Sequence, residues 1–152
     1  SKTHVHRFAY MNLFGDSIHN FIDGLIIGSS YLISIPVGIA TSLAVILHEI
    51  PQEIGDFGVL IHAGITRKKA LLYNFLTATT SIFGTLIALL LSSKINGATN
   101  MLSAFAAGSF IYIAGSDLIP ELHKETELKK SALQIFTFIL GLAIMYGLLI
   151  VG

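Results

Sequence analysis

His48-Glu49-Ile50-Pro51-Gln52-Glu53 is a polar stretch, with Asp56 just beyond it, inside a segment from about 36 to 63 that is otherwise apolar. The segment is longer than the roughly 20 apolar residues that cross a bilayer as a helix. Each carboxylate at a bilayer centre costs about 2.5 to 3.5 kcal/mol, so the three acidic residues here require compensation. A bound cation is the simplest compensation, and the stretch therefore predicts a membrane helix that binds a positive ion.

The polar side chains share one face of this predicted helix. At about 100° per residue, an arc of about 140° holds all five of them: His48, Gln52, Asp56, Glu49 and Glu53. Pro51 lacks an N–H and its ring crowds the carbonyl of Leu47, so we expect a kink and a free carbonyl oxygen beside the arc. Together these features leave room for an ion.

The composition indicates a membrane protein. The 152 residues are 53% hydrophobic and only 12% charged, and the mean hydropathy is +0.77. Soluble domains average about 25% charged residues. With no cysteine, there is neither a disulfide framework nor a thiolate site, which leaves His, carboxylate and amide groups as metal ligands. The chain opens in a polar loop at Ser1, so we expect the N-terminal part of a longer protein to precede it.

A second polar arc lies on the preceding apolar segment, from about 8 to 32. Its members, which fall within about 100° of one another, are Asp16, His19, Asn20 and Asp23. Gly24 and Gly28 form a small-xxx-small pair that lets a neighbouring helix approach closely. The short turn from 31 to 36 makes the two segments an antiparallel hairpin, so the two arcs lie at similar depth.

Three further segments complete an expected all-α, polytopic fold of five membrane helices in a single domain, at about 8–32, 36–63, 70–91, 101–122 and 131–151. The third carries only Asn74 and hydroxyl groups, which usually bond within or between helices. In the fourth, Asp117 and Glu121 share a face and either line an exit or are wetted at the interface. His62, and likewise His4 and His6, are either ion contacts or solvated interfacial residues.

The basic residues predict the orientation. Eight of the nine Lys and Arg residues lie before the first helix or in the loops near Arg67 and Lys124, and only Lys94 lies on the other side. The positive-inside rule then makes the N-terminus of the chain cytoplasmic. We expect an integral protein of the plasma (inner) membrane, and no long basic surface indicates nucleic acid.

If the two arcs meet, they supply a metal site. His19, Asp23, His48 and Gln52 form a ligand set that suits zinc and tolerates iron(II), manganese or cadmium. Asn20, Glu49 and Glu53 provide a second, harder site one step around the helices. Asp16, Asp56, His62, Asp117 and Glu121 are candidate residues of the ion pathway. Because His and carboxylates must lose protons to bind a metal, we expect binding to depend on pH.

These spacings on consecutive membrane helices resemble those of the ZIP family of divalent-metal transporters. The matching stretches are Asp16-Ser17-Ile18-His19-Asn20-Phe21-Ile22-Asp23-Gly24 and His48-Glu49-Ile50-Pro51-Gln52-Glu53-Ile54-Gly55-Asp56-Phe57, with support from Leu60-Ile61-His62-Ala63-Gly64 and Asp117-Leu118-Ile119-Pro120-Glu121-Leu122. The resemblance implies that the chain is the last five of eight helices, with three helices and a cytoplasmic loop before Ser1, and that zinc or iron(II) moves into the cytoplasm.

By this likeness His19, Asp23 and His48 line the primary site, Asn20 and Glu49 the neighbouring one, and Gln52 lies between them. Many relatives have His at Gln52 and others Glu, and a neutral amide is a weaker ligand. The expected partners are a divalent metal ion, membrane lipid, the missing helices of the same chain and a second copy in a homodimer.

Two alternatives remain. In an intramembrane zinc-dependent hydrolase, the metal would activate water, and His48-Glu49 begins like the motif His-Glu-x-x-His; but Gln52 replaces the second His and Pro51 breaks the turn that this motif requires. In a purely structural reading, the arcs only hydrogen-bond to each other and must hide their carboxylates without a cation. We expect a transporter rather than an enzyme.

Overall fold

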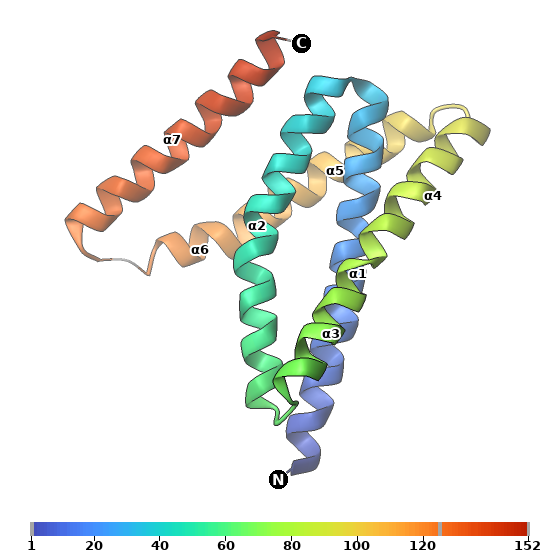
Figure 1. Ribbon diagram of the computed structural model, residues 1–152. Coiled ribbons are helices and arrows are strands. Elements are labelled where there is room, and N and C mark those ends of the chain that lie inside the picture. The colour runs from blue at the N-terminus through green and yellow to red at the C-terminus, as the bar shows by residue number, and fades with distance from the viewer. Residues whose placement is uncertain (1, 125, 152) are drawn as a thin grey trace.

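The computed structural model describes residues 2–124 and 126–151, which are helical almost throughout and contain no strand. Helices α1 (Lys2–Ile33) and α2 (Ile35–His62) form an antiparallel hairpin (Figure 1). Helices α3 (Arg67–Ala78) and α4 (Thr80–Lys94) lie alongside α1 (Figure 1). α5 (Ala98–Ile113), the π-helical turn η1 (Ala114–Leu118) and α6 (Ile119–Leu122) pass behind this group, and α7 (Leu128–Val151) lies to one side (Figure 1). The all-α fold class expected from the sequence is confirmed.

The turn between α1 and α2 is a single residue, Ser34, and is therefore tighter than the expected turn over 31–36. Its backbone is extended and its hydroxyl accepts a hydrogen bond from the Val37 N–H at 3.3 Å, which caps α2. Pro36 lies in the first turn of α2, where backbone N–H groups have no acceptor within the helix. The missing N–H of proline therefore costs no helical hydrogen bond there. This tight turn places the polar arcs of the two helices opposite each other.

Small residues bring α4 against α1. A Cβ added to Gly24 would collide with the backbone of Ser81, and one added to Gly84 would collide with the carbonyl of Phe21. A Cβ on Gly28 would lie 2.9 Å from the Cβ of Ala88. The close approach predicted from Gly24 and Gly28 is therefore present, and α4 is the helix that uses it.

The helical stretch from 67 to 94 is broken at Thr79, where the sequence predicted one continuous helix. Hydroxyls around this point bond to carbonyls three residues earlier, including Thr79 Oγ1 to Leu76 O at 2.6 Å and Ser81 Oγ to Ala78 O at 2.7 Å. Such bonds compete with the backbone ladder and bend helices. Thr85 Oγ1 instead reaches α1 and donates to Gly24 O at 3.0 Å.

The loop between α2 and α3 is closed by a glycine. Gly64 has φ +86, and the Ile65 N–H donates to Leu60 O while the Gly64 N–H donates to Ile61 O, a Schellman motif that satisfies the last carbonyls of α2. Beside it, Leu60 packs with three buried alanines, Ala9, Ala63 and Ala70. This small core joins α1, α2 and α3 at the end of the molecule that carries the N-terminus.

Among the described residues, two helical stretches are long and apolar enough to cross a membrane, Ile35–His62 and Arg67–Lys94. Large apolar side chains are exposed on every long helix, including Phe14, Ile54, Phe83 and Phe136. In contrast to these exposed apolar side chains, polar groups gather between α1 and α2.

Between α5 and α6, the wide π turn comes just before Pro120, whose ring does not fit a regular α turn.

Candidate metal site

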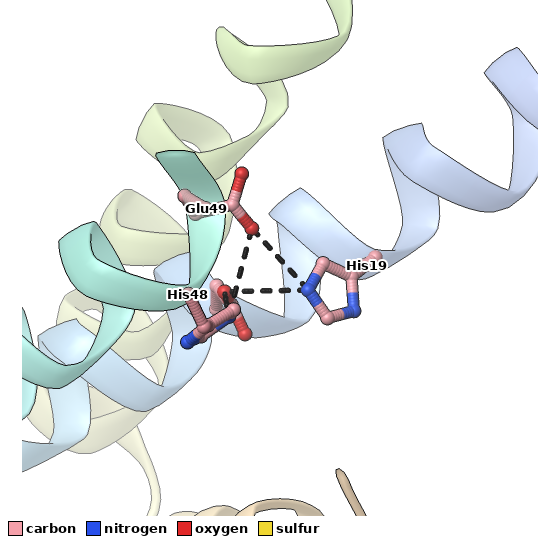
Figure 2. A group of neighbouring side chains, drawn as sticks. His19, His48 and Glu49 are labelled. Atoms are coloured by element: carbon pink, nitrogen blue, oxygen red, sulfur yellow. Dashed lines mark hydrogen bonds and ion pairs between the residues drawn. The ribbon is translucent and has the colours of Figure 1, made fainter. Parts of the chain in front are cut away.

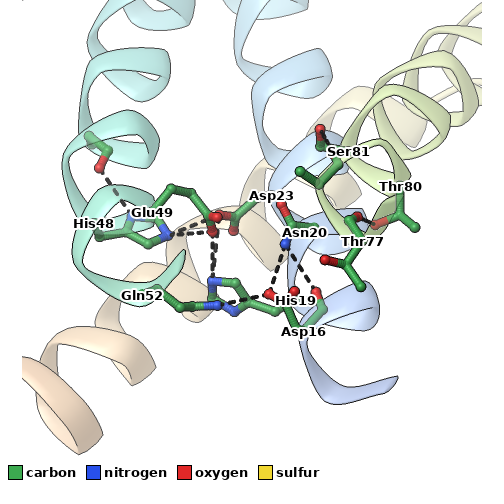
Figure 3. A network of polar contacts seen from close by, with 12 residues as sticks. Asp16, His19, Asn20, Asp23, His48, Glu49, Gln52, Thr77, Thr80 and Ser81 are labelled. Carbon is green, nitrogen blue, oxygen red and sulfur yellow. Dashed lines mark hydrogen bonds and ion pairs between the residues drawn. The ribbon is translucent and has the colours of Figure 1, made fainter. Parts of the chain in front are cut away.

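Four side chains converge between α1 and α2: His19 and Asp23 from α1, and His48 and Glu49 from α2 (Figure 2, Figure 3). Each of them offers one ligand atom, and these four atoms all lie within 4.8 Å of one another. His19 and Asp23 are one helical turn apart and therefore share a face of α1. The cluster exists because the hairpin sets this face of α1 against the residues one turn before Pro51 on α2.

Four of the six distances among these ligand atoms are close to those around a tetrahedral ion. His48 Nε2 lies 2.9 Å from Asp23 Oδ2 and 3.6 Å from Glu49 Oε1, and His19 Nε2 lies 3.2 Å from Glu49 Oε1 and 3.6 Å from Asp23 Oδ2. A tetrahedral zinc with bonds of about 2.0 to 2.1 Å separates its ligand atoms by about 3.3 Å. The observed distances fall on both sides of that value, so small side-chain adjustments suffice to hold the ion.

The backbone orients His48. Its Nδ1 lies 3.0 Å from the carbonyl oxygen of Ala44, one turn earlier on α2. Donation of the Nδ1 proton to this carbonyl leaves the Nε2 lone pair directed toward the cluster. In metal-binding histidines, a hydrogen bond from the nitrogen that does not bind the metal fixes the tautomer in this way. The two imidazole rings meet edge to face, with centroids 5.5 Å apart, so both can present a nitrogen to one ion.

Several atoms of the cluster are buried without a hydrogen-bond partner among the described residues. They are Asp23 Oδ1, together with His19 Nε2 and Glu49 Oε1, whose 3.2 Å ion-pair contact is not counted as a hydrogen bond. The Asp23 side chain is only 1% exposed. A carboxylate in such a position is strongly unfavourable unless a positive charge compensates it. The donor set of two imidazoles and two carboxylates, half of its oxygen atoms unsatisfied, fits a divalent cation.

Gln52 and Asn20, two of the predicted ligands, point to a neighbouring carboxylate instead. The Asn20 amide donates to Asp16 Oδ1 at 2.9 Å, and the Gln52 amide donates to the same oxygen at 3.4 Å (Figure 3). Glu49, which the likeness assigned to a neighbouring site, reaches into the cluster in the place expected for Gln52. Metal binding by each of these residues remains a prediction.

Glu53 faces a different cavity. This space of about 380 Å³ lies between α1, α2 and the α3–α4 stretch, and it is lined by Asn20, Asp23, Glu49, Glu53 and Asn74 among others. Asn74 donates to the Glu53 backbone carbonyl at 2.9 Å, and its own Oδ1 is buried without a hydrogen-bond partner in the described part of the chain. The grouping of Asn20, Glu49 and Glu53 expected from the sequence is therefore present around one cavity, with Asn74 as an additional member.

Other candidate residues lie apart from the cluster. His62 is exposed beside a mostly apolar cavity, and 14 residues of helix put it about 20 Å from His48. Asp117 lies in η1 and Glu121 in α6. The side chains of Asp117, Glu121, His4 and His6 lie outside the described part of the structure, so their predicted roles stay untested.

Sequence reasoning overlooked Asn12, whose amide donates to Asp56 Oδ1 at 2.8 Å across the hairpin. A signal existed, because Asn12 is four residues before Asp16 and therefore extends the same polar face of α1. Asn74 was noted as a polar residue of an apolar segment, but its contact with Glu53 depends on how α3 packs against α2.

Comparison with known proteins defines the class. Residues 1–149 match the family model described as ZIP Zinc transporter. The chain is 41% identical over 140 residues to IAA-alanine resistance protein 1 of Arabidopsis thaliana, covering 90% of this chain and 30% of that protein. It is 40% identical over 142 residues to Zinc transporter zipt-7.2 of Caenorhabditis elegans, covering 91% and 31%, and 40% identical over 151 residues to Metal cation symporter ZIP14 of Bos taurus, covering 97% and 30%.

The chain belongs to the ZIP family, as its motifs predicted. It is therefore a polytopic membrane protein, and its family is one of transporters rather than enzymes, which removes the hydrolase alternative. The chain spans about a third of the length of these relatives. No solved structure matches it.

Proposed function

We propose that this chain forms the metal-binding core of a transporter that moves divalent metal ions, zinc foremost, across a membrane. The convergence of His19, Asp23, His48 and Glu49 within 4.8 Å carries the proposal. Two imidazoles and two carboxylates are a borderline-soft set, which suits zinc and accepts iron(II), manganese or cadmium. The names of two relatives, a zinc transporter and a metal cation symporter, support zinc or another metal cation as the cargo.

The ion is the cargo of this site and must leave it again. The 2.9 Å contact between His48 Nε2 and Asp23 Oδ2 needs a shared proton when no ion is bound, and an arriving cation displaces that proton. Metal binding therefore weakens as the pH falls. Because three of the four ligands are partly exposed, at 14% for His48, 24% for His19 and 16% for Glu49, the ion can exchange rather than remain as a structural metal.

The direction of transport is proposed to be into the cytoplasm of the cell, across the plasma membrane. The N-terminus of α1 and the α2–α3 loop lie at the same end of the hairpin (Figure 1), and Arg67, Lys68 and Lys69 follow that loop. The positive-inside rule places this end in the cytoplasm. Ions entering from the end that holds Ser34 would then reach the cluster and leave toward the N-terminus of α1.

The exposed apolar faces of the helices support three kinds of partner: membrane lipid, further helices of a longer chain and a second copy in a homodimer. The relatives are about three times longer than the matched region, which favours further helices of the same chain as one of these partners. Transport then requires the longer protein, with this chain supplying its metal site.

The experiment is zinc uptake by cells that express the full-length protein, beside His48→Ala and Asp23→Ala variants at equal surface abundance. Uptake should fall to background in both variants. His123→Ala is the matched control, because that ring is exposed and its hydrogen bond among the described residues is to its own helix turn at Ile119 O; its uptake should equal that of the wild type. Wild-type uptake in cells carrying His48→Ala would remove the cluster from the transport site.

A further inference from the structure

A second group of oxygen ligands lies beside the cluster, toward the N-terminus of α1. It comprises Asp16 and Asn12 from α1 and Gln52 and Asp56 from α2. With His19 and Gly15, these residues line a cavity of about 280 Å³. His19 belongs both to this cavity and to the cluster, so the two sites are adjoining spaces along the same helix pair.

The cross-helix contacts form a regular series along α2. His48 pairs with Asp23 at 2.9 Å, Gln52 with Asp16 at 3.4 Å and Asp56 with Asn12 at 2.8 Å. The three residues of α2 are four positions apart, so successive contacts lie about 6 Å apart along the axis. Polar contacts thus continue from the cluster toward the proposed cytoplasmic end, while the outer faces of both helices stay apolar.

Asp16 is the residue that indicates a ligand. Its side chain is 95% buried, since only 5% is exposed. Its Oδ1 accepts from the amides of Asn20 and Gln52, but its Oδ2 is buried without a hydrogen-bond partner among the described residues. An ionised oxygen buried in this way is costly. No Lys or Arg occurs anywhere between positions 8 and 62, so the hairpin places no lysine or arginine beside this oxygen.

We propose that Asp16 and Asp56, assisted by the amide oxygens of Asn12 and Gln52, bind a second divalent cation in this cavity. Two carboxylates and two amides supply only hard oxygen ligands. Such a set favours binding of Mn²⁺, Mg²⁺ or Ca²⁺ over tight binding of zinc. An ion leaving the soft cluster would therefore meet a weaker site next to it. Its role as a release site rests on the proposed function, whereas binding itself does not.

The test uses purified full-length protein that has been loaded with one equivalent of zinc, and Mn²⁺ as the probe. The electron paramagnetic resonance signal of free Mn²⁺ disappears on binding, so titration counts sites and gives their affinity. The wild type should bind one Mn²⁺, Asp56→Asn should bind it at least tenfold more weakly, and the double variant Asp16→Asn, Asp56→Asn should not bind it. The new amide at position 56 can still accept from Asn12, so the single variant preserves the fold.

Glu127→Gln is the matched control, because it removes a carboxylate far along the chain that pairs with Lys130 at 2.8 Å; its Mn²⁺ binding should equal that of the wild type. In His48→Ala, Mn²⁺ binding should persist even though zinc uptake is lost, which separates this proposal from the transport function. Unchanged Mn²⁺ affinity in the double variant would overturn the proposal, and so would a zinc-loaded wild type that binds no Mn²⁺.

Discussion

Replacing Gly24 with alanine should loosen the contact between α1 and α4 next to the metal cluster. A Cβ at this position meets the backbone of Ser81, with its carbonyl carbon at 2.7 Å and its Cα at 2.8 Å. Carbon atoms in favourable contact lie about 3.5 to 4.0 Å apart. The obstructing atoms are backbone rather than a flexible side chain, and the Ser81 carbonyl oxygen lies closer to the added Cβ than either carbon. The two helices must therefore separate by more than about 1 Å.

The expected loss of stability can be worked from three contributions. Overpacking of this kind destabilises by about 1 to 3 kcal/mol. Separation also weakens the hydrogen bond from Thr85 Oγ1 to Gly24 O, which is 3.0 Å long and contributes about 1 kcal/mol. Alanine recovers about 0.5 to 1 kcal/mol relative to glycine inside a helix. The net destabilisation is about 1 to 3 kcal/mol.

The assay is reversible unfolding of the purified full-length protein in mixed detergent and dodecyl sulfate micelles, followed by circular dichroism. Gly141→Ala is the matched control, because that glycine lies inside α7 with no atom of the described residues within 4 Å of an added Cβ; its stability should be unchanged or slightly raised. Zinc affinity should fall in Gly24→Ala and stay unchanged in Gly141→Ala, because the proposed ligand Asp23 directly precedes Gly24. Equal stability of Gly24→Ala and the wild type would refute this account of helix packing.

Three further results are expected. Thr85→Val should lower stability by about 0.5 to 1.5 kcal/mol in the same unfolding assay, because it removes one interhelical hydrogen bond; an unchanged midpoint would contradict that bond. Gly64→Ala should lower stability by about 1 kcal/mol, because φ is +86 there, and a neutral result would argue against the left-handed turn. Gln52→His adds an imidazole beside Asp16 and should raise zinc affinity relative to Mn²⁺ at the second cavity, as measured by competition calorimetry; no change would place residue 52 outside that cavity.

The hairpin and its facing polar arcs were predictable because they depend on local spacing. Apolar length set the helices, and a period of about 3.6 residues put His19 and Asp23 on one face and His48 and Glu49 within reach of it. The small residues Gly24 and Gly28 likewise predicted a close helix contact, although the sequence did not say which helix makes it.

The membership of the cluster was harder to predict, because a helical wheel gives angles on one helix but not the rotation of two helices about their axes. Glu49 lies about 100° from His48 on the wheel, yet its long side chain reaches back to His19 at 3.2 Å. Gln52 is closer in angle but is one turn farther along α2, where it meets Asp16. Glu49 therefore joins the cluster because of its side-chain length and its depth along α2, although its angle on the wheel made it a poorer candidate than Gln52.

The break at Thr79 and the role of Asn74 depended on contacts between segments distant in sequence. Hydroxyl groups near Thr79 were expected to bond to carbonyls, but whether those bonds bend the helix depends on α1 packed against it. Asn74 gains its position only because α3 lies against α2, so its backbone contact with Glu53 has no local signature.

X-ray absorption at the zinc edge, on purified full-length protein with one equivalent of zinc, tests the central claim most directly. The zinc should have four nitrogen and oxygen ligands at about 2.0 to 2.1 Å, with outer scattering from two imidazoles that drops to one in His48→Ala. Scattering without imidazole, or a six-coordinate shell of oxygens alone, would contradict a metal site built from His19, Asp23, His48 and Glu49.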